Sequence, residues 1–137
     1  MEAKDLMIGD WVLWNTYPMK VMMIGSRMVK LYNEDNSIED DEISPMPITI
    51  DFLEKNGFDE LMNESEVSAA RFGRKPEPTG VWQYGFGRFD SVAYVPEQSF
   101  LRIKFMEGCQ ADIANIKYVH ELQHALRLCG VEKEIIL

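Results

Sequence analysis

The sequence predicts an α+β fold: a small N-terminal β-barrel or meander, a short linking helix, and an antiparallel sheet covered by a C-terminal helix. Three observations lead to this prediction. Short apolar runs separated by turn residues fill the first fifty positions, and a second set of such runs lies between residues 81 and 105. Runs of this kind are typical of short strands joined by tight turns. The third observation is an amphipathic stretch over residues 115–129, whose apolar positions recur with the helical period.

The N-terminal strands are expected at residues 11–14, 19–24 and 28–32, with an edge strand at 38–43. Short strands with tight turns favour an SH3-like small barrel or meander. The prolines in Ser44-Pro-Met-Pro47 cannot donate ladder hydrogen bonds and mark its end. We therefore expect a first domain at residues 1–48.

Three aromatic residues of this first domain, Trp11, Trp14 and Tyr17, have two interpretations. If exposed together, they would form an aromatic binding patch. Alternatively, they fill the small core, as aromatic side chains in small domains often do.

The remaining residues, 49–137, are expected to form an α+β lobe. Thr49 is a suitable N-cap for a helix at 50–56, and Gly57 stops it. The polar span 59–80 is rich in glycine and proline and predicts a mobile loop.

The rest of the lobe follows from apolar patterns. Strands are expected at 81–87, 91–95 and 100–105, and the helix at 115–129 covers their dry face. Residues 132–137 could add a last strand.

Charge and cysteine content limit the partners and the compartment. The 137-residue chain carries a net charge of −9, so an acidic surface would repel nucleic-acid phosphates. The N-terminus lacks a secretory signal, and no apolar stretch is long enough to span a membrane. Cys109 and Cys129 are best interpreted as reduced thiols. Together these features predict a cytoplasmic protein, with no membrane contact and nucleic acid an unlikely partner.

A zinc-hydrolase signature lies in the C-terminal helix, where His120-Glu121-Leu-Gln-His124 spells H-E-x-x-H. In such enzymes the two histidines bind zinc and the glutamate acts as general base. On a helical wheel, however, His120 and His124 lie with Lys117 and Arg127, opposite the apolar stripe. This placement predicts histidines on the solvated face.

A catalytic zinc needs a third protein ligand, which the residues after the motif do not supply. The upstream string Glu107-Gly-Cys109 followed by H-E-x-x-H resembles peptide deformylases, in which the cysteine is that ligand. This resemblance would make Cys109, His120 and His124 the ligands and Glu121 the base. His120 is only eleven positions after Cys109, whereas the family places several strands between the cysteine and the helix.

Three segments together carry a second resemblance: Asp5-Leu-x-Ile-Gly-Asp-Trp-Val12, Pro47-Ile-Thr-x-x-x-Leu-Glu-Lys-Asn-Gly-Phe58 and Tyr118-Val-His-Glu-Leu-Gln-His-Ala-Leu-Arg-Leu-Cys-Gly130. The chain is similar in them to a group of small proteins encoded by gut Bacteroidales and their phages or other mobile elements. No activity is assigned to that group, so no site residues follow from the resemblance. It implies an accessory protein of the cytoplasm.

The hypothesis we carry forward is a non-enzymatic accessory or protein-interaction protein with an unidentified protein partner, no cofactor, and no catalytic or metal-binding residues. The alternative is a zinc-dependent, deformylase-like hydrolase that uses His120, His124, Cys109 and Glu121. A third hypothesis is an acidic mimic of nucleic acid. The interaction hypothesis predicts that both histidines are exposed.

Overall fold

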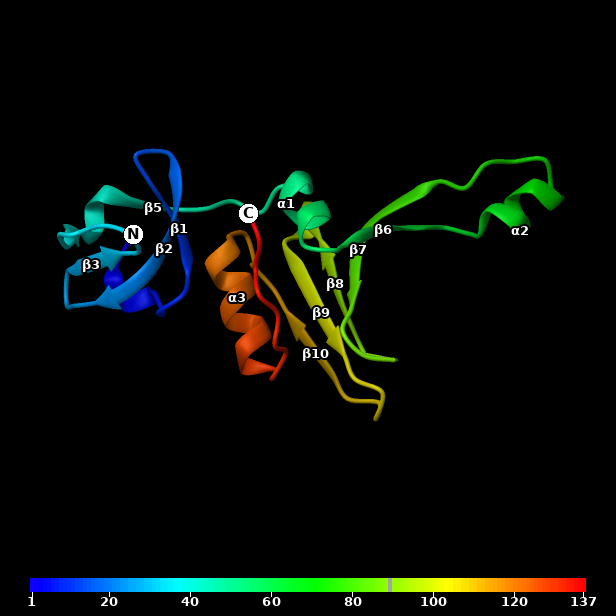
Figure 1. Ribbon diagram of the computed structural model, residues 1–137. Coiled ribbons are helices and arrows are strands. Elements are labelled where there is room, and N and C mark those ends of the chain that lie inside the picture. The colour runs from blue at the N-terminus through cyan, green and yellow to red at the C-terminus, as the bar shows by residue number, and fades with distance from the viewer. Residues whose placement is uncertain (89) are drawn as a thin grey trace. The chain divides into compact units, whose positions relative to one another are not determined.

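The computed structural model describes residues 1–88 and 90–137 and has an α+β fold with two antiparallel sheets (Figure 1). It divides into two compact units. The first contains Met1–Ile48, Lys117–Ile135 and Leu137, and the second contains Thr49–Ile116 and Ile136. The expected domains, 1–48 and 49–137, differ from these units in the placement of residues 117–135 and of Leu137.

Backbone hydrogen bonds explain that difference. The Val119 N–H donates to the Met46 carbonyl at 2.8 Å, and the Ile48 N–H donates to the Lys117 carbonyl at 3.3 Å. Pro47 and Tyr118 form an isolated antiparallel bridge. The start of the C-terminal helix is thus tied to the end of the first sheet. That this helix covers the second sheet remains a prediction.

The first sheet has the strand order β4-β3-β2-β1-β5. Its strands are β1 (Trp11–Trp14), β2 (Tyr17–Ile24), β3 (Met28–Leu31), β4 (Ile38–Glu39) and β5 (Ile43–Pro45). The expected edge strand at 38–43 is divided by the 3₁₀ helix η2 (Asp40–Glu42), and another, η1 (Ala3–Asp5), precedes β1. Since β4 and β5 are the two edges, the sheet is open rather than a closed barrel. Strands β1 to β4 form a meander, and β5 returns to pair with β1.

One face of this sheet forms the core of the first unit. Its fully buried members include Val12, Val21, Val29 and Leu31, and Trp14 packs against them. Trp11 and Trp14 are three positions apart on β1, so their side chains point to opposite faces. Trp11, Trp14 and Tyr17 therefore do not form one aromatic patch.

The second sheet is a meander with the order β10-β9-β8-β7-β6. It contains β6 (Asp59–Met62), β7 (Pro78–Gly85), β8 (Ser91–Val95), β9 (Phe100–Lys104) and β10 (Gln110–Ile113), with the 3₁₀ helix η3 (Pro96–Gln98) between β8 and β9. The three predicted strands are confirmed as β7, β8 and β9. On β9, Leu101 and Ile103 are fully buried, while Arg102 forms an exposed ion pair with Asp112, as the alternation predicts.

The linking helix α1 (Ile50–Lys55) has the predicted cap, because the Thr49 hydroxyl accepts the Phe52 N–H at 3.1 Å. Gly57 follows with φ +80°, a conformation that glycine adopts without strain. Both local predictions are confirmed.

The prediction of a loop at 59–80 is wrong. The segment forms β6, the helix α2 (Glu66–Arg71) and the first part of β7. Ser65 caps α2 by accepting the Ser68 N–H at 3.1 Å. Gly73 and Pro76 lie between α2 and β7, and Pro78 and Gly80 lie in the first part of β7. A composition typical of loops therefore hid these elements.

The C-terminal helix α3 (Val119–Leu128) is shorter than the expected 115–129. The backbone of Ile116 is hydrogen-bonded within the second unit and so does not join the helix. Its N–H donates to the Ser99 carbonyl, and its carbonyl accepts the Tyr94 hydroxyl. Residues 132–137 form no strand. In the part of the chain that the structure describes, no helix has the length and apolar character needed to cross a membrane.

Candidate functional site

The polar centre of the first unit is a turn that precedes β1. The Asp10 N–H donates to the Met7 carbonyl at 3.1 Å, and Gly9 has φ +92°, a value that suits glycine in such turns. The Asp10 carboxylate folds back and accepts the Met7 N–H at 2.7 Å through Oδ2. The turn thereby carries a carboxylate whose side chain is fully buried.

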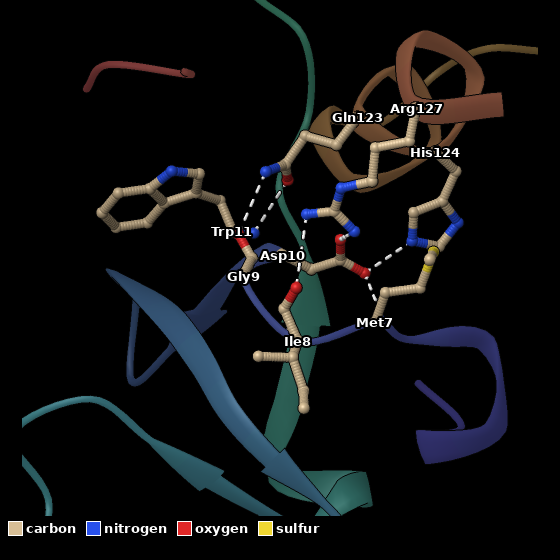
Figure 2. A network of polar contacts seen from close by, with 8 residues as sticks. All are labelled: Met7, Ile8, Gly9, Asp10, Trp11, Gln123, His124 and Arg127. Atoms are coloured by element: carbon tan, nitrogen blue, oxygen red, sulfur yellow. Dashed lines mark hydrogen bonds and ion pairs between the residues drawn. The ribbon is translucent and has the colours of Figure 1, made fainter. Parts of the chain in front are cut away.

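Helix α3 supplies the partners of this carboxylate (Figure 2). His124 Nε2 lies 2.6 Å from Asp10 Oδ2, and Arg127 Nη1 lies 3.4 Å from Asp10 Oδ1. An ionised carboxylate only accepts hydrogen bonds, so His124 donates from Nε2. The pairing is necessary because an unpaired buried charge would be strongly destabilising.

Gln123 fixes the backbone on either side of Asp10. Its Oε1 accepts the Trp11 N–H at 2.9 Å, and its Nε2 donates to the Gly9 carbonyl at 3.0 Å. The Arg127 guanidinium also donates to the Ile8 carbonyl at 3.3 Å. One face of α3 therefore holds four consecutive residues, Ile8 to Trp11, as Figure 2 shows.

Glu121, the general base of the hydrolase hypothesis, caps its own helix. Its Oε1 accepts the N–H groups of Lys117 and Tyr118, both at 3.0 Å. A carboxylate at this position satisfies helix-terminal N–H groups that have no partner within the helix. The glutamate of the H-E-x-x-H string thus has a structural role.

His120 is buried, with 8% of its surface exposed. Its ring stacks on Tyr118 with centroids 6.0 Å apart and meets the His124 ring edge-on at 5.6 Å. Within the described residues its Nδ1 has no hydrogen-bond partner. Burial lowers the pKa of His120, although the nearby charges of Asp10 and Glu121 act in the opposite direction.

The histidines line a surface groove of about 690 Å³ in the first unit. Its other walls come from the N-terminal segment, including Leu6 and Met7, and from Pro45 and Tyr118. Neither histidine is on a solvated face, because His120 is buried and the His124 side chain is only 23% exposed. The predicted exposure of both residues is wrong, because the Asp10 turn covers the polar side of the helix.

The proposed metal ligands belong to different units, His120 and His124 to the first and Cys109 to the second. Among residues 1–88 and 90–137, no group of three or more His, Cys, Asp or Glu side chains is arranged to hold a metal ion. Cys109 is an exposed free thiol of the second unit, and Cys129 is a half-buried free thiol of the first. Asp10 and Gln123 were missed by sequence reasoning; the only signal was the Gly9-Asp10 turn, which names no partner.

We expect Asp10→Ala to lower the free energy of unfolding by about 1–3 kcal/mol, because the Met7 N–H, His124 and Arg127 lose the carboxylate oxygens that they contact. Urea unfolding followed by circular dichroism would measure the change. Asp5→Ala, which removes an exposed carboxylate from the same N-terminal segment, is the matched control and should change stability by less than about 0.5 kcal/mol. Equal effects of the two substitutions would contradict the role given to Asp10.

We also expect His120 to make the first unit less stable in acid. Since the pKa of His120 is lowered in the folded protein, the unfolded state binds the proton first. This contribution to stability is complete above the unfolded pKa, about 6.5, and is lost as pH falls through the folded pKa. His120→Phe, which keeps a ring against Tyr118, should reduce the loss between pH 7.5 and 5.5 in urea unfolding. An unchanged pH dependence would show that other groups cause it.

Comparisons with known proteins assign no function to this site. No family model, no curated protein and no solved structure matches the chain. The roles of Asp10, Gln123 and His124 therefore depend on the contacts described above.

Proposed function

We propose that this chain is a non-enzymatic protein-interaction protein that acts as an accessory factor. The observation that carries the proposal is an ordered tip, residues 63–77, at the end of the β6–β7 hairpin. Figure 1 shows α2 at the far end of this hairpin, away from the other strands of the second sheet. The tip presents apolar side chains to solvent on a fixed scaffold.

Specific contacts hold the tip in shape. Asn63 and Glu77 close its base, with the Asn63 N–H donating to the Glu77 carbonyl at 2.9 Å and the Glu77 N–H donating to Asn63 Oδ1 at 3.0 Å. The Arg74 guanidinium donates hydrogen bonds to both carboxylate oxygens of Glu64, at 2.6 and 2.8 Å. Bidentate pairs of this kind fix geometry as well as charge.

The ordered tip nevertheless leaves large apolar groups in water. Val67 is 75% exposed and Phe72 is 67% exposed, and Leu61 and Met62 of the adjoining β6 are also exposed. A single exposed apolar residue is ordinary, whereas a group of them on one projecting element favours a contact with another protein. This supports the interaction function.

Residue roles in α3 weigh against the zinc-hydrolase alternative. That reaction needs Glu121 as a free base, but its carboxylate accepts two backbone N–H groups. It also needs His124 as a ligand, while Nε2 of that ring is bonded to Asp10. The H-E-x-x-H spacing is thus explained by helix capping and helix docking.

The remaining parts of the proposal concern context. We place the protein in the cytoplasm, supported by two cysteines that form no disulfide, and among the accessory proteins of mobile elements, supported by the sequence resemblance. The SH3-like character of residues 1–48 also belongs to the proposal. Its support is the strand order, in which β5 returns to pair with β1 beside the β1-β2-β3 meander.

We expect Val67→Ser with Phe72→Ser to abolish partner capture without unfolding the chain, since both side chains are exposed. The measurement is crosslinking in the producing cell followed by quantitative mass spectrometry, then titration of the purified partner. Met106→Ser with Leu128→Ser removes two comparably exposed apolar groups elsewhere and should leave capture unchanged. Equal recovery by both double variants would overturn the role of the tip.

A zinc assay separates the two functions. We expect protein purified without a His tag to retain much less than one zinc per chain after dialysis. Glu121→Gln should keep the melting temperature, because a glutamine oxygen can still accept the two N–H groups. Stoichiometric zinc, together with a hydrolytic activity that Glu121→Gln removes, would reject the interaction proposal in favour of the hydrolase.

A further inference from the structure

The outer face of the first sheet gathers exposed apolar side chains and two lysines, and it belongs to the first unit, whereas the tip belongs to the second. Val21 of β2 and Val29 and Leu31 of β3 point into the core. Their neighbours along each strand point to the opposite face, because side chains alternate in a strand. Strand pairing sets Met23 opposite Lys30, and the Tyr32 N–H donates to the Lys20 carbonyl at 2.9 Å.

These pairings assemble one continuous surface. An irregularity in register between Val21 and Met23 adds Met22, which is exposed, to the same region. We call the surface formed by Lys20, Met22, Met23, Lys30 and Tyr32 the lysine–methionine face. Trp11 borders it on β1, paired with Lys20, whose Nζ lies 5.5 Å from the Trp11 ring centroid.

The apolar side chains of the lysine–methionine face are accessible to solvent. Met23 is 57% exposed and Tyr32 is 47% exposed. Methionine side chains are flexible and polarisable, and they adapt to varied apolar partners. Their exposure on a sheet face therefore favours the binding of apolar side chains from another chain.

The charge of the face is opposite to that of the protein. Lys20 and Lys30 have no ion-pair partner in the described part of the chain. Glu34 and Asp35 follow in the next turn without pairing with either lysine. Two unpaired cations stand here on a chain of net charge −9. This is the charge pattern that an acidic partner complements.

We propose that the lysine–methionine face binds an acidic segment of a partner protein that also carries apolar side chains. The two lysines pair with its carboxylates, and Met22, Met23 and Tyr32 cover its apolar groups. A peptide fits better than single-stranded nucleic acid, because the overall negative charge repels a phosphate chain and adaptable methionines suit apolar side chains. The inference rests on the proposed interaction function but uses a different surface from the tip.

The test uses the full chain and a fluorescein-labelled peptide of alternating glutamate and leucine residues, followed by fluorescence anisotropy. We expect saturable binding that weakens as salt rises, because the attraction between exposed charges is screened. Lys20→Glu with Lys30→Glu should raise Kd by at least about tenfold. Met22→Ser with Met23→Ser should also weaken binding while leaving its salt dependence unchanged.

Matched controls separate the face from net charge and from the tip. Lys55→Glu with Lys104→Glu makes the same change of charge at exposed positions of the second unit and should leave Kd unchanged. Val67→Ser with Phe72→Ser should also bind the peptide normally, so failure of the tip proposal would not alter this result. Near-ultraviolet circular dichroism confirms that each variant is folded.

Three outcomes would overturn the inference. The first is an absence of saturable peptide binding by the wild-type chain. The second is equal weakening by the two lysine double variants, which would show a response to net charge alone. The third is tighter binding of oligothymidylate than of the peptide, which would assign the face to nucleic acid.

Discussion

The first unit depends on the burial of one carboxylate. Asp10 is fully buried, and a buried charge is tolerated only when it is paired and hydrogen-bonded. His124 and Arg127 provide the pairing from α3, and the Met7 N–H adds a backbone bond. Since α3 is more than a hundred residues further along the chain, Asp10 requires the C-terminal helix to return to the N-terminal sheet. The grouping of residues 117–135 with residues 1–48 follows from this requirement.

The docking of α3 also accounts for the residues of the H-E-x-x-H string. Histidines four apart lie on one helical face, as metal ligands do, and Gln123 and Arg127 flank them. Here that face packs against the turn that carries Asp10. Gln123 bonds to the backbone of Gly9 and Trp11, His124 bonds to Asp10, and Glu121 caps the helix. The motif spacing is a property of helix geometry and therefore does not separate docking from catalysis.

The two surfaces that we propose for partner binding arise differently in the two units. In the second unit, local contacts such as Arg74 with Glu64 fold a tip that keeps Val67 and Phe72 in water. In the first unit, strand pairing gathers two lysines and two methionines from β2 and β3. The sequence pattern assigns the residues of the tip to a loop and those of the lysine–methionine face to ordinary strands. Their arrangement within each unit, rather than the sequence pattern, is what supports the proposed role in recognition.

The sequence alone determined the features that depend on neighbouring residues. Alternation predicted β7, β8 and β9, Thr49 predicted the start of α1, and Gly57 predicted its end. The tertiary structure decided which helix face is buried, since the Trp11–Gln123 hydrogen bond joins residues 112 positions apart. It also decided the order of the segment 59–80, where capping and ion pairs outweigh a composition typical of loops. Local periodicity shows which residues share a face of a helix or strand. The partner of a buried polar group, however, lies far away in the sequence, and no local pattern identifies it.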